Sequence, residues 1–473
     1  MLPTLLDYCS TNHQLCPLLS AKRLPTRTLH ISGEFPELYL TLHVSTENEE
    51  GKYAALSYCW GGPQALCLTM DNLKYLQNAQ LYINQLPKTL SDAILVTRSL
   101  DLQFLWVDAL CIIQDSPADK EHEINKMCSI YENSIITIAA STSDSVKTGF
   151  IKPTISYNTP HSSCTVQLPF QNQDGEEGWA DVTFSPSQTQ HTDAYPINKR
   201  GWTFQEAFVP HRMLVFGDIE PFLRCRSSDT VRLSQSTTSY YNSRIEPRRV
   251  LYGGKPYNSS YPEEHDERQF RGLWKYIVEQ YSFRQFSLEA DRPLAIRGVV
   301  EFLTKIYKGE CYHGIWSMCP ISCLLWASHP REGEEPVRRP EVPTWSWMSL
   351  SSTEIDSSNL ELLGNNEGEA TIRFSDAPHD QLHITCQVLY EEEVYKANDI
   401  VDYWDDLGHD WSGVDDTEWE GLFLLVLART VNQRLLTIET KCGSDGVYRR
   451  RGVMEIREVE KWLSRPKVTI ALH

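Results

Sequence analysis

The chain has 473 residues and a formal charge of −19, because 63 acidic residues outnumber 44 basic ones. An acidic surface repels phosphate groups, so this charge argues against non-specific binding to nucleic acid. An apolar fraction of 41% and the presence of 13 Trp, 22 Tyr and 15 Phe exclude a mostly disordered protein.

The first well-defined element that the sequence predicts is a short buried strand at 53–58. It is apolar, and the segment 60–63 (Trp-Gly-Gly-Pro) that follows is typical of a turn. Residues 1–50 are expected to form an irregular arm with short extended pieces. A helix is predicted from Leu86 to about Leu100, because apolar side chains recur there with helical spacing.

A second buried strand is predicted at 104–113, an almost uninterrupted apolar run that is typical of the centre of a parallel sheet. A helix is expected from about Asp119 to Asn133, and residues 135–140 are predicted to form a third buried strand. Strands that alternate with helices indicate an α/β fold built on a parallel sheet.

Smaller elements are predicted after the third strand. Residues 151–190 are polar and are expected to contain hairpins. A helix opening is predicted at 200–208, and two paired strands are predicted at 213–216 and 222–225. Two further helices are expected within 269–310.

The pattern divides the chain into three regions. Residues 1–225 are predicted to form the α/β core, residues 226–368 a helical and loop-rich extension, and residues 369–473 a β-rich region that packs on the core. Within the last region, the acidic stretch at 399–420 is expected to be a solvated surface loop. The fold class is therefore α/β with a mixed α and β C-terminal region.

The cellular setting can also be predicted from the sequence. The N-terminus has no basic flank, and Pro3 and Asp7 interrupt its apolar residues, so we expect no secretory signal. The 13 cysteines form no small disulfide framework, which favours reduced thiols in the cytosol or nucleus, and we expect a cytoplasmic protein. No apolar run approaches the roughly 20 residues that span a bilayer, so no membrane partner is expected.

One group of potential metal ligands stands out in the sequence. Cys311, His313, Cys319 and Cys323 are of the right residue types, but their spacing is not that of a standard zinc module. We therefore expect no metal site there and no metal or other cofactor in the protein.

Three segments, taken in chain order, resemble the signature of the fungal HET (heterokaryon incompatibility) family. The first is 53–61 (Tyr-Ala-Ala-Leu-Ser-Tyr-Cys-Trp-Gly), and the second is 86–140, centred on Leu-Trp-Val-Asp-Ala-Leu-Cys-Ile-Ile-Gln at 105–114. The third is 200–216, which begins Arg-Gly-Trp-Thr-Phe-Gln-Glu. Downstream segments, such as Trp-Ser-Trp at 345–347, extend the resemblance over nearly the whole chain.

The resemblance implies a fungal source and a role in self/non-self recognition and cell death. It also implies a distant TIR-like, flavodoxin-like core. Many TIR domains cleave NAD between nicotinamide and ribose, using a glutamate on a helix that follows a central strand. A carboxylate can stabilise the oxocarbenium-like transition state of this reaction. We therefore expect a stand-alone nucleotide glycohydrolase-like enzyme with NAD as its substrate.

Four residues are candidates for catalysis. Under the TIR-like interpretation Glu123 is the first choice, although it could be an exposed helix residue. Glu206 could be the catalytic acid or could pair with Arg200. Asp108 lies in an apolar run, where a carboxylate is costly unless it is paired, so it is a site residue or a structural anchor. Cys111 is a nucleophile if a histidine lies near it, and otherwise an inert buried thiol.

Residues around these groups are expected to bind the substrate, because ligands of open α/β sheets lie beyond the carboxyl ends of the strands. Their mixture of hydroxyl, amide, guanidinium and indole groups suits a polar ligand with a flat ring. Each also has a structural alternative, such as core packing for a tryptophan. The predicted binding residues are Ser57, Tyr58, Trp60, Gly61, Gln114, Arg200, Trp202 and Gln205.

Two other functions stay open. The same site could serve a biosynthetic enzyme that acts on a fungal small-molecule metabolite. Alternatively, the chain could be a non-catalytic signalling module that self-associates or answers to an upstream sensor protein. An enzyme should bring at least two of Glu123, Glu206, Asp108 and Arg200 to one place, whereas an interaction module should leave them dispersed and expose an apolar patch.

Overall fold

The computed structural model divides the chain into two compact units, Met1–Ser243 and Arg244–His473, each of which is described here by itself. The acidic stretch predicted at 399–420 lies largely outside the described residues, and its described part, Ile400–Asp405, is a strand. The structure describes residues 2–13, 15–151, 164–171, 177–184, 195–217, 221–227, 231–232, 267–307, 309–330, 337–351, 353–356, 370–375, 381–390, 400–405, 422–429, 435–442, 448–457 and 459–473.

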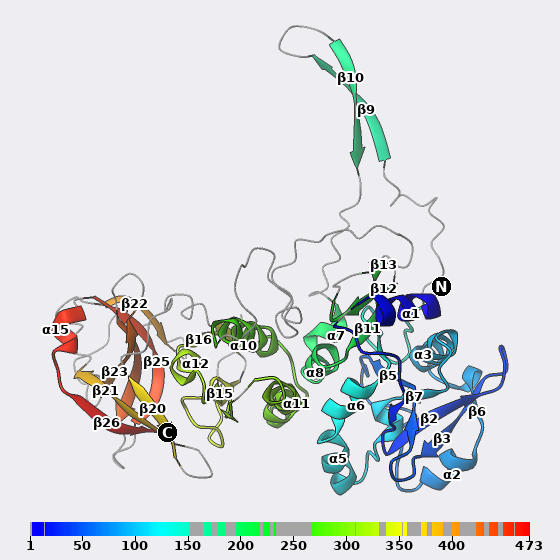
Figure 1. The fold of residues 1–473 in the computed structure, drawn as a ribbon, viewed down its shortest axis with the longest axis horizontal. Helices are drawn as coiled ribbons and strands as arrows, with labels where there is room; N and C mark the ends of the chain where they lie inside the picture. Colours follow the sequence, from blue (N-terminus) through cyan, green and yellow to red (C-terminus); the bar gives the residue numbers. More distant parts are fainter. Residues whose placement is uncertain are drawn as a thin grey trace. The chain divides into compact units, whose positions relative to one another are not determined.

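The first unit is built on a mixed sheet of nine described strands, in the order β13-β12-β11-β8-β5-β7-β2-β3-β6 (Figure 1). The four neighbours β7, β5, β8 and β11 run parallel to one another, and the outer strands pair antiparallel. The α/β fold class is thus confirmed. The strands are β2 (Arg27–Ser32), β3 (Tyr39–Val44), β5 (Tyr53–Ser57), β6 (Leu81–Tyr82), β7 (Phe104–Trp106), β8 (Ile136–Ala139), β11 (Arg212–Phe216), β12 (Pro221–Cys225) and β13 (Val231–Arg232).

The parallel strands lie at the centre because their sequences are apolar on both faces. Every residue of β5 and of β8 is buried, as expected for strands that are covered on both sides. Tyr53 fixes a helix to this layer, because its hydroxyl donates a hydrogen bond of 2.6 Å to the carbonyl oxygen of Ile130.

Short helices accompany the sheet (Figure 1). Two further ribbons, β1 (Lys22–Arg23) with β4 (Glu50–Gly51) and β9 (Cys164–Gln171) with β10 (Glu177–Phe184), pair antiparallel. The second ribbon confirms that the segment 151–190 contains a hairpin. The helices are α1 (Leu2–Asn12), α2 (Leu73–Asn78), η1 (Ile83–Gln85), α3 (Lys88–Ser99), α4 (Asp108–Cys111), α5 (Pro117–Ile124), α6 (Met127–Asn133), α7 (Pro196–Lys199) and α8 (Thr203–Phe208).

Three sequence expectations were wrong in detail. Residues 1–50 are not an irregular arm, because β2 and β3 belong to the main sheet. The helix expected over 119–133 is two helices, and Ser116 begins the first by accepting a hydrogen bond from the Asp119 amide. The apolar run 104–113 is a strand only as far as Trp106. An apolar run by itself does not distinguish a strand from a buried helix.

The strand order creates a switch point at β5. β5 is the first of the four parallel strands in the chain, and it lies between β7 and β8. The chain passes from β5 to β7 on one side and then crosses to β8 on the other side. In open α/β sheets, ligands bind at such a point, beyond the carboxyl ends of the strands. The carboxyl end of β5 is therefore where the fold favours a site. The finer TIR-like and flavodoxin-like assignment stays a prediction.

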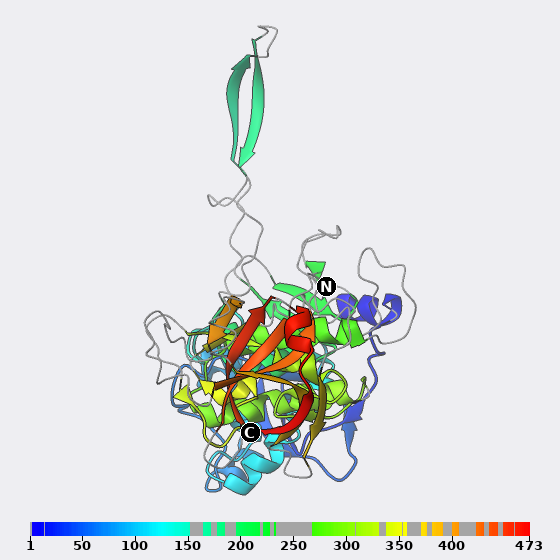
Figure 2. The ribbon, with the colours of Figure 1, turned by 90° about the vertical axis from the view of Figure 1, so that its left-hand side faces the viewer.

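The second unit combines helices with a seven-stranded, mostly antiparallel sheet, whose C-terminal strands are orange and red in Figure 2. The two helices expected within 269–310 are confirmed as α10 (Glu267–Ser282) and α11 (Arg292–Thr304). None of the described helices has the length and apolar character that a bilayer crossing requires. The sheet comprises β20 (Thr371–Phe374), β21 (Leu382–Tyr390), β22 (Ile400–Asp405), β23 (Leu422–Arg429), β24 (Leu435–Cys442), β25 (Tyr448–Ile456) and β26 (Lys467–Leu472).

The remaining elements of the second unit are short. They are η3 (Glu289–Asp291), β14 (Cys311–Tyr312), β15 (Ile315–Trp316), α12 (Pro320–Leu324), β16 (Ala327–Pro330), β17 (Val337–Arg338), η4 (Trp347–Ser349), β18 (Leu350–Ser351), β19 (Thr353–Asp356) and α15 (Val459–Leu463). The β-rich character predicted from residue 369 onward is confirmed.

Candidate active site

A buried carboxyl group lies at the carboxyl end of β5. Ser57 is the last residue of β5, and its Oγ donates a hydrogen bond of 2.5 Å to Oε2 of Glu206 in α8. Glu206 is only 5% exposed. Burial raises the pKa of Glu206 to about 7, and the nearby Asp108 carboxylate contributes to this rise. Glu206 can therefore exchange a proton near neutral pH.

A second carboxyl group follows the neighbouring strand β7. The sequence predicts Asp108 within a strand, but in the structure it is the first residue of α4. Its Oδ2 accepts a hydrogen bond of 2.8 Å from the indole of Trp60, and its Oδ1 accepts one of 2.7 Å from the Ala109 amide. Burial raises the pKa of Asp108, while the positive charge of Arg200 lowers it. Asp108 and Trp60 are only partly buried, so both keep some contact with solvent.

A guanidinium group accompanies the two carboxyl groups. Arg200 precedes α8 and donates a hydrogen bond of 2.6 Å to the carbonyl oxygen of Tyr58. Its charge favours the ionised form of both Asp108 and Glu206. An enzyme was expected to bring at least two of four named residues to one place. Three of them, Asp108 in α4, Arg200 before α8 and Glu206 in α8, lie together.

Two tyrosines lie against the carboxyl groups. Tyr58 is 2% exposed, and its hydroxyl interacts with the Asp108 carboxylate. Burial raises the pKa of Tyr58 well above its usual value, and the Asp108 carboxylate contributes. Tyr131, which is not among the site residues that the sequence predicts, donates a hydrogen bond of 3.2 Å to the Leu56 carbonyl and lies near Glu206. Its place in the second family-like segment was the available signal.

The other predicted binding residues surround this cluster in different ways. Gln114 donates hydrogen bonds to the carbonyl oxygens of Asp108 and Ile112, at 3.2 and 3.0 Å, and so holds the short helix that carries Asp108. Trp202, immediately before α8, is partly buried, whereas Gln205 within α8 is 1% exposed. By its two hydrogen bonds, Gln114 therefore supports the position of Asp108 in the site.

Gly61 shapes the turn after β5. Its φ of +70° is in the region that favours glycine, and a Cβ there would lie 2.1 Å from Cβ of Ser145. We expect Gly61→Ala to lower the free energy of unfolding by about 1–3 kcal/mol. Denaturant unfolding would measure this. Gly272→Ala is the control, because Gly272 lies exposed in α10 with open space around it, and alanine there should stabilise by about 0.5–1 kcal/mol. Equal stability of Gly61→Ala and wild type would contradict the strained turn.

Glu123, the first choice for catalysis, does not join the cluster. It is fully buried in α5, and its nearest charged atoms are Nζ of Lys126 at 3.6 Å and Nε2 of His122 at 3.8 Å. Neither of its carboxylate oxygens has a hydrogen-bond partner among the described residues, so it does not bond to Asp108 or Glu206. The alternative of an exposed helix glutamate does not hold, because Glu123 is buried, and its catalytic role stays a prediction.

Cys111 also has surroundings that do not suit catalysis. It is fully buried at the end of α4, and its Sγ accepts a hydrogen bond of 3.5 Å from the Val107 amide. Burial raises the pKa of the Cys111 thiol to about 12. A nucleophilic cysteine needs a lowered pKa, so these surroundings favour the alternative of an inert buried thiol.

Comparison with known protein families finds one match within the chain. Residues 53–206 match the family described as heterokaryon incompatibility protein (HET). The match begins in β5 and ends at Glu206, so it encloses the whole carboxylate cluster. Comparisons with curated proteins and with solved structures found no match. Residues 53–206 therefore match a HET domain, and this match covers about a third of the chain.

Proposed function

We propose that this chain is an enzyme that hydrolyses a nucleotide, with NAD as the expected substrate, at the cluster of Ser57, Asp108, Arg200 and Glu206. The observation that carries the proposal is the pair of carboxyl groups at the switch point of the sheet, one of which has a pKa of about 7. Carboxyl groups with shifted pKa values gather at catalytic sites, because acid and base chemistry at neutral pH requires them.

Aromatic and charged side chains beside the carboxyl groups support a ligand-binding role. The buried Tyr58 hydroxyl lies against the Asp108 carboxylate at the end of β5. The partly buried indoles of Trp60 and Trp202 offer flat surfaces for a ring, and the Arg200 guanidinium suits a diphosphate.

The proposed reaction follows from the two carboxyl environments. Asp108, which retains solvent contact, stabilises the positive charge that develops on the ribose as the bond between C1′ and the nicotinamide nitrogen breaks. The bonding electron pair leaves with nicotinamide. A water oxygen then bonds to C1′, and Glu206 accepts the proton that this water loses. Nicotinamide and ADP-ribose are the products.

The test is the consumption of NAD by the purified full chain, followed by chromatography over a series of protein concentrations. Wild type should release nicotinamide. Asp108→Asn and Glu206→Gln should each lower kcat by about 100-fold or more, because each removes a group that acts in the transition state. Glu123→Gln is the matched control, since Glu123 is equally buried but lies outside the cluster, and it should keep the wild-type rate.

The remaining outcomes separate the alternative functions. If folded wild type leaves NAD intact but turns over another nucleotide or a fungal metabolite, and Glu206→Gln abolishes that turnover, the site is catalytic with a different substrate. Overexpression in cells tests for toxicity of the chain. If no substrate is consumed, and if Asp108→Asn and Glu206→Gln are as toxic as wild type, the enzyme proposal fails. A signalling module that acts by self-association then becomes the better account.

A further inference from the structure

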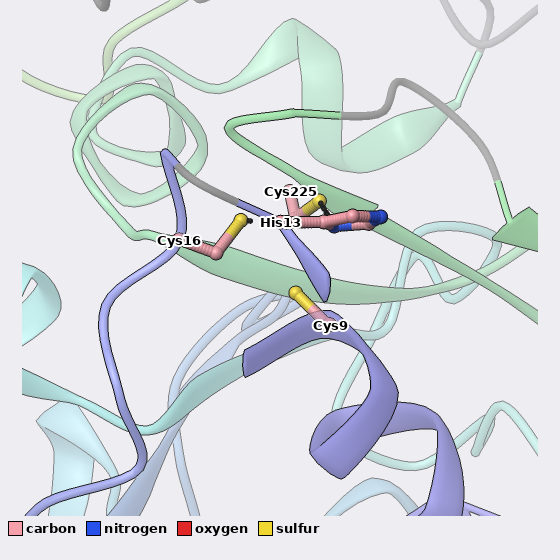
Figure 3. A group of neighbouring side chains, drawn as sticks. All are labelled: Cys9, His13, Cys16 and Cys225. Carbon is pink, nitrogen blue, oxygen red and sulfur yellow. Dashed lines mark hydrogen bonds between the residues drawn. The ribbon is translucent and has the colours of Figure 1, made fainter. Parts of the chain in front are cut away.

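Three cysteines and one histidine converge at the edge of the first unit, away from the carboxylate cluster. Their potential ligand atoms all lie within 4.8 Å of one another, and Figure 3 shows the four side chains pointing toward a common centre. Nδ1 of His13 lies 3.3 Å from Sγ of Cys225 and 3.9 Å from Sγ of Cys16. The fourth member is Cys9. The three cysteines are buried and the histidine is partly buried.

These distances fit a tetrahedral metal site. Zinc binds cysteine sulfur at about 2.3 Å and histidine nitrogen at about 2.0–2.1 Å, which places the ligand atoms of a tetrahedron about 3.5–3.8 Å apart. The two nitrogen–sulfur distances lie on either side of this range. Only small side-chain adjustments would be needed to enclose an ion.

Local structure brings three of the ligands together. Cys9 lies in the last turn of α1, and the amide of His13 donates a hydrogen bond of 3.3 Å to the Cys9 carbonyl. The amide of Cys16 in turn donates one of 3.2 Å to the His13 carbonyl. These two bonds close consecutive turns, so the three side chains gather on one side of the backbone. Cys225, the last residue of β12, completes the set from a distant part of the chain.

The charge around the cluster also suits thiolate ligands. Arg212 is 2% exposed, and its Nε donates a hydrogen bond of 3.2 Å to Sγ of Cys9, while another guanidinium nitrogen bonds to the Pro17 carbonyl. A buried guanidinium requires compensating negative charge. Three thiolates and one divalent cation carry a net charge of −1, which the arginine would balance. Ser227 also places its hydroxyl 3.6 Å from Sγ of Cys16.

We propose that Cys9, His13, Cys16 and Cys225 bind one zinc ion in a structural site. Four protein ligands complete a tetrahedral shell and leave no open position for substrate, which is typical of structural rather than catalytic zinc. The ion would fasten the N-terminal helix and the loop after it to strand β12, which pairs with the edge strand β13 of the main sheet. This site is independent of the proposed hydrolase activity.

The chain offers a built-in comparison. Cys319 and Cys323 are also buried, with their Sγ atoms 3.7 Å apart. Cys9, His13, Cys16 and Cys225 are called the Cys9 group. Among the described residues, however, the Cys9 group is the one that gathers a histidine and cysteines at metal-binding distance. Cys323→Ser is therefore a matched control, because it removes a buried, paired cysteine without removing a proposed ligand.

The test measures zinc directly in the purified full chain. Elemental analysis after exhaustive dialysis should give one zinc per chain for wild type and for Cys323→Ser. The content should fall to near zero for Cys16→Ser and Cys225→Ser. Wild type loaded with cobalt after zinc removal should show the d–d absorption of a tetrahedral complex and thiolate-to-cobalt charge transfer. His13→Cys should retain the metal, and its cobalt spectrum should show a stronger charge-transfer band.

Two results would overturn the proposal. One is reduced, folded wild type that carries no zinc and gives no tetrahedral cobalt spectrum. The other is a zinc content that is unchanged in the ligand variants. Titration of thiols in denaturant identifies the competing arrangement, because a disulfide within the cluster would leave fewer than the 13 free thiols of the sequence. If the cysteine variants fail to fold, His13→Ala, which alters a partly buried side chain, provides the same zinc measurement.

Discussion

Replacing Arg27 with methionine is expected to lower the free energy of unfolding of the first unit by about 3–5 kcal/mol. One guanidinium nitrogen lies 2.5 Å from Oδ2 of Asp119, and Nε donates a hydrogen bond of 2.7 Å to the Cys111 carbonyl. The same Asp119 oxygen accepts a hydrogen bond of 2.8 Å from the Ile113 amide. The side chains of both ionic partners are largely buried, at 8% and 17% exposure. Removing the arginine would leave a buried carboxylate without its counter-charge.

The loss should also reach the candidate active site. Arg27 holds the end of α4, and Asp108 is the first residue of that helix. We therefore expect Arg27→Met to reduce any activity of the Asp108 cluster as well as stability. Urea unfolding of the full chain provides the measurement. Arg23→Met is the control, because Arg23 is exposed in β1, and its effect should stay within about 0.5 kcal/mol.

A double variant separates the ion pair from packing. Arg27→Met combined with Asp119→Leu removes both charges, so it should recover part of the stability that the single variant loses. Equal stability losses for Arg27→Met and Arg23→Met would contradict the proposed role of the buried pair.

Glu206 is expected to make stability depend on pH in an unusual direction. Its pKa in the folded chain is about 7, compared with the ordinary 4.5, so the folded state holds this proton more tightly than the unfolded state does. The resulting stabilisation is fully present below about pH 4.5 and is lost as the pH rises through 7. At about 1.4 kcal/mol per unit of pKa, the contribution amounts to about 3 kcal/mol.

Glu206→Gln isolates this effect. Glutamine keeps the shape of the protonated side chain but does not titrate, so wild type should lose about 3 kcal/mol relative to the variant between pH 4.5 and 8. Unfolding free energies of both proteins, measured at intervals across that range, provide the test. The difference cancels the titration of every other group that the two proteins share. Parallel pH profiles would show that Glu206 is ionised at ordinary pH in the folded chain.

Ser57→Ala provides a second check on the same group. The Ser57 hydroxyl favours the ionised form of Glu206 by donating a hydrogen bond to it. Its removal should therefore raise the pKa of Glu206 further and move the loss of stability to higher pH. A pKa of Glu206 that is unchanged in Ser57→Ala would show that the Ser57 hydroxyl does not stabilise the ionised carboxylate.

Much of the fold could be predicted because its signals are local. The buried strands at 53–58 and 135–140 and the helices within 269–310 follow from apolar runs and helical spacing, and the structure confirms them. The strand predicted over 104–113 was wrong beyond Trp106, because a strand and a short helix that are buried on all sides have equally apolar sequences. The structure decides the matter by ending the strand at Trp106 and beginning a helix at Asp108.

The residue types of the candidate site could be predicted from the sequence, but not which of them come together. Glu123 was the first choice for the catalytic carboxylate, and Glu206 was a candidate that could also pair with Arg200. The structure buries Glu123 beside Lys126 and brings Glu206 to Ser57 across 149 positions of sequence. The Cys9 group was overlooked for the same reason, since its fourth member, Cys225, lies 212 positions beyond His13.

The sequence by itself therefore determined the α/β class, the HET-like character of residues 53–206 and the acidic, aromatic-rich composition of this chain, because composition, periodicity and short motifs are encoded locally. Only the tertiary structure decided the partners of its buried polar groups. Those partners depend on which strands lie side by side at the switch point, and strand order is set by packing between distant segments. The pKa of Glu206 and the convergence of the cysteines both follow from that packing.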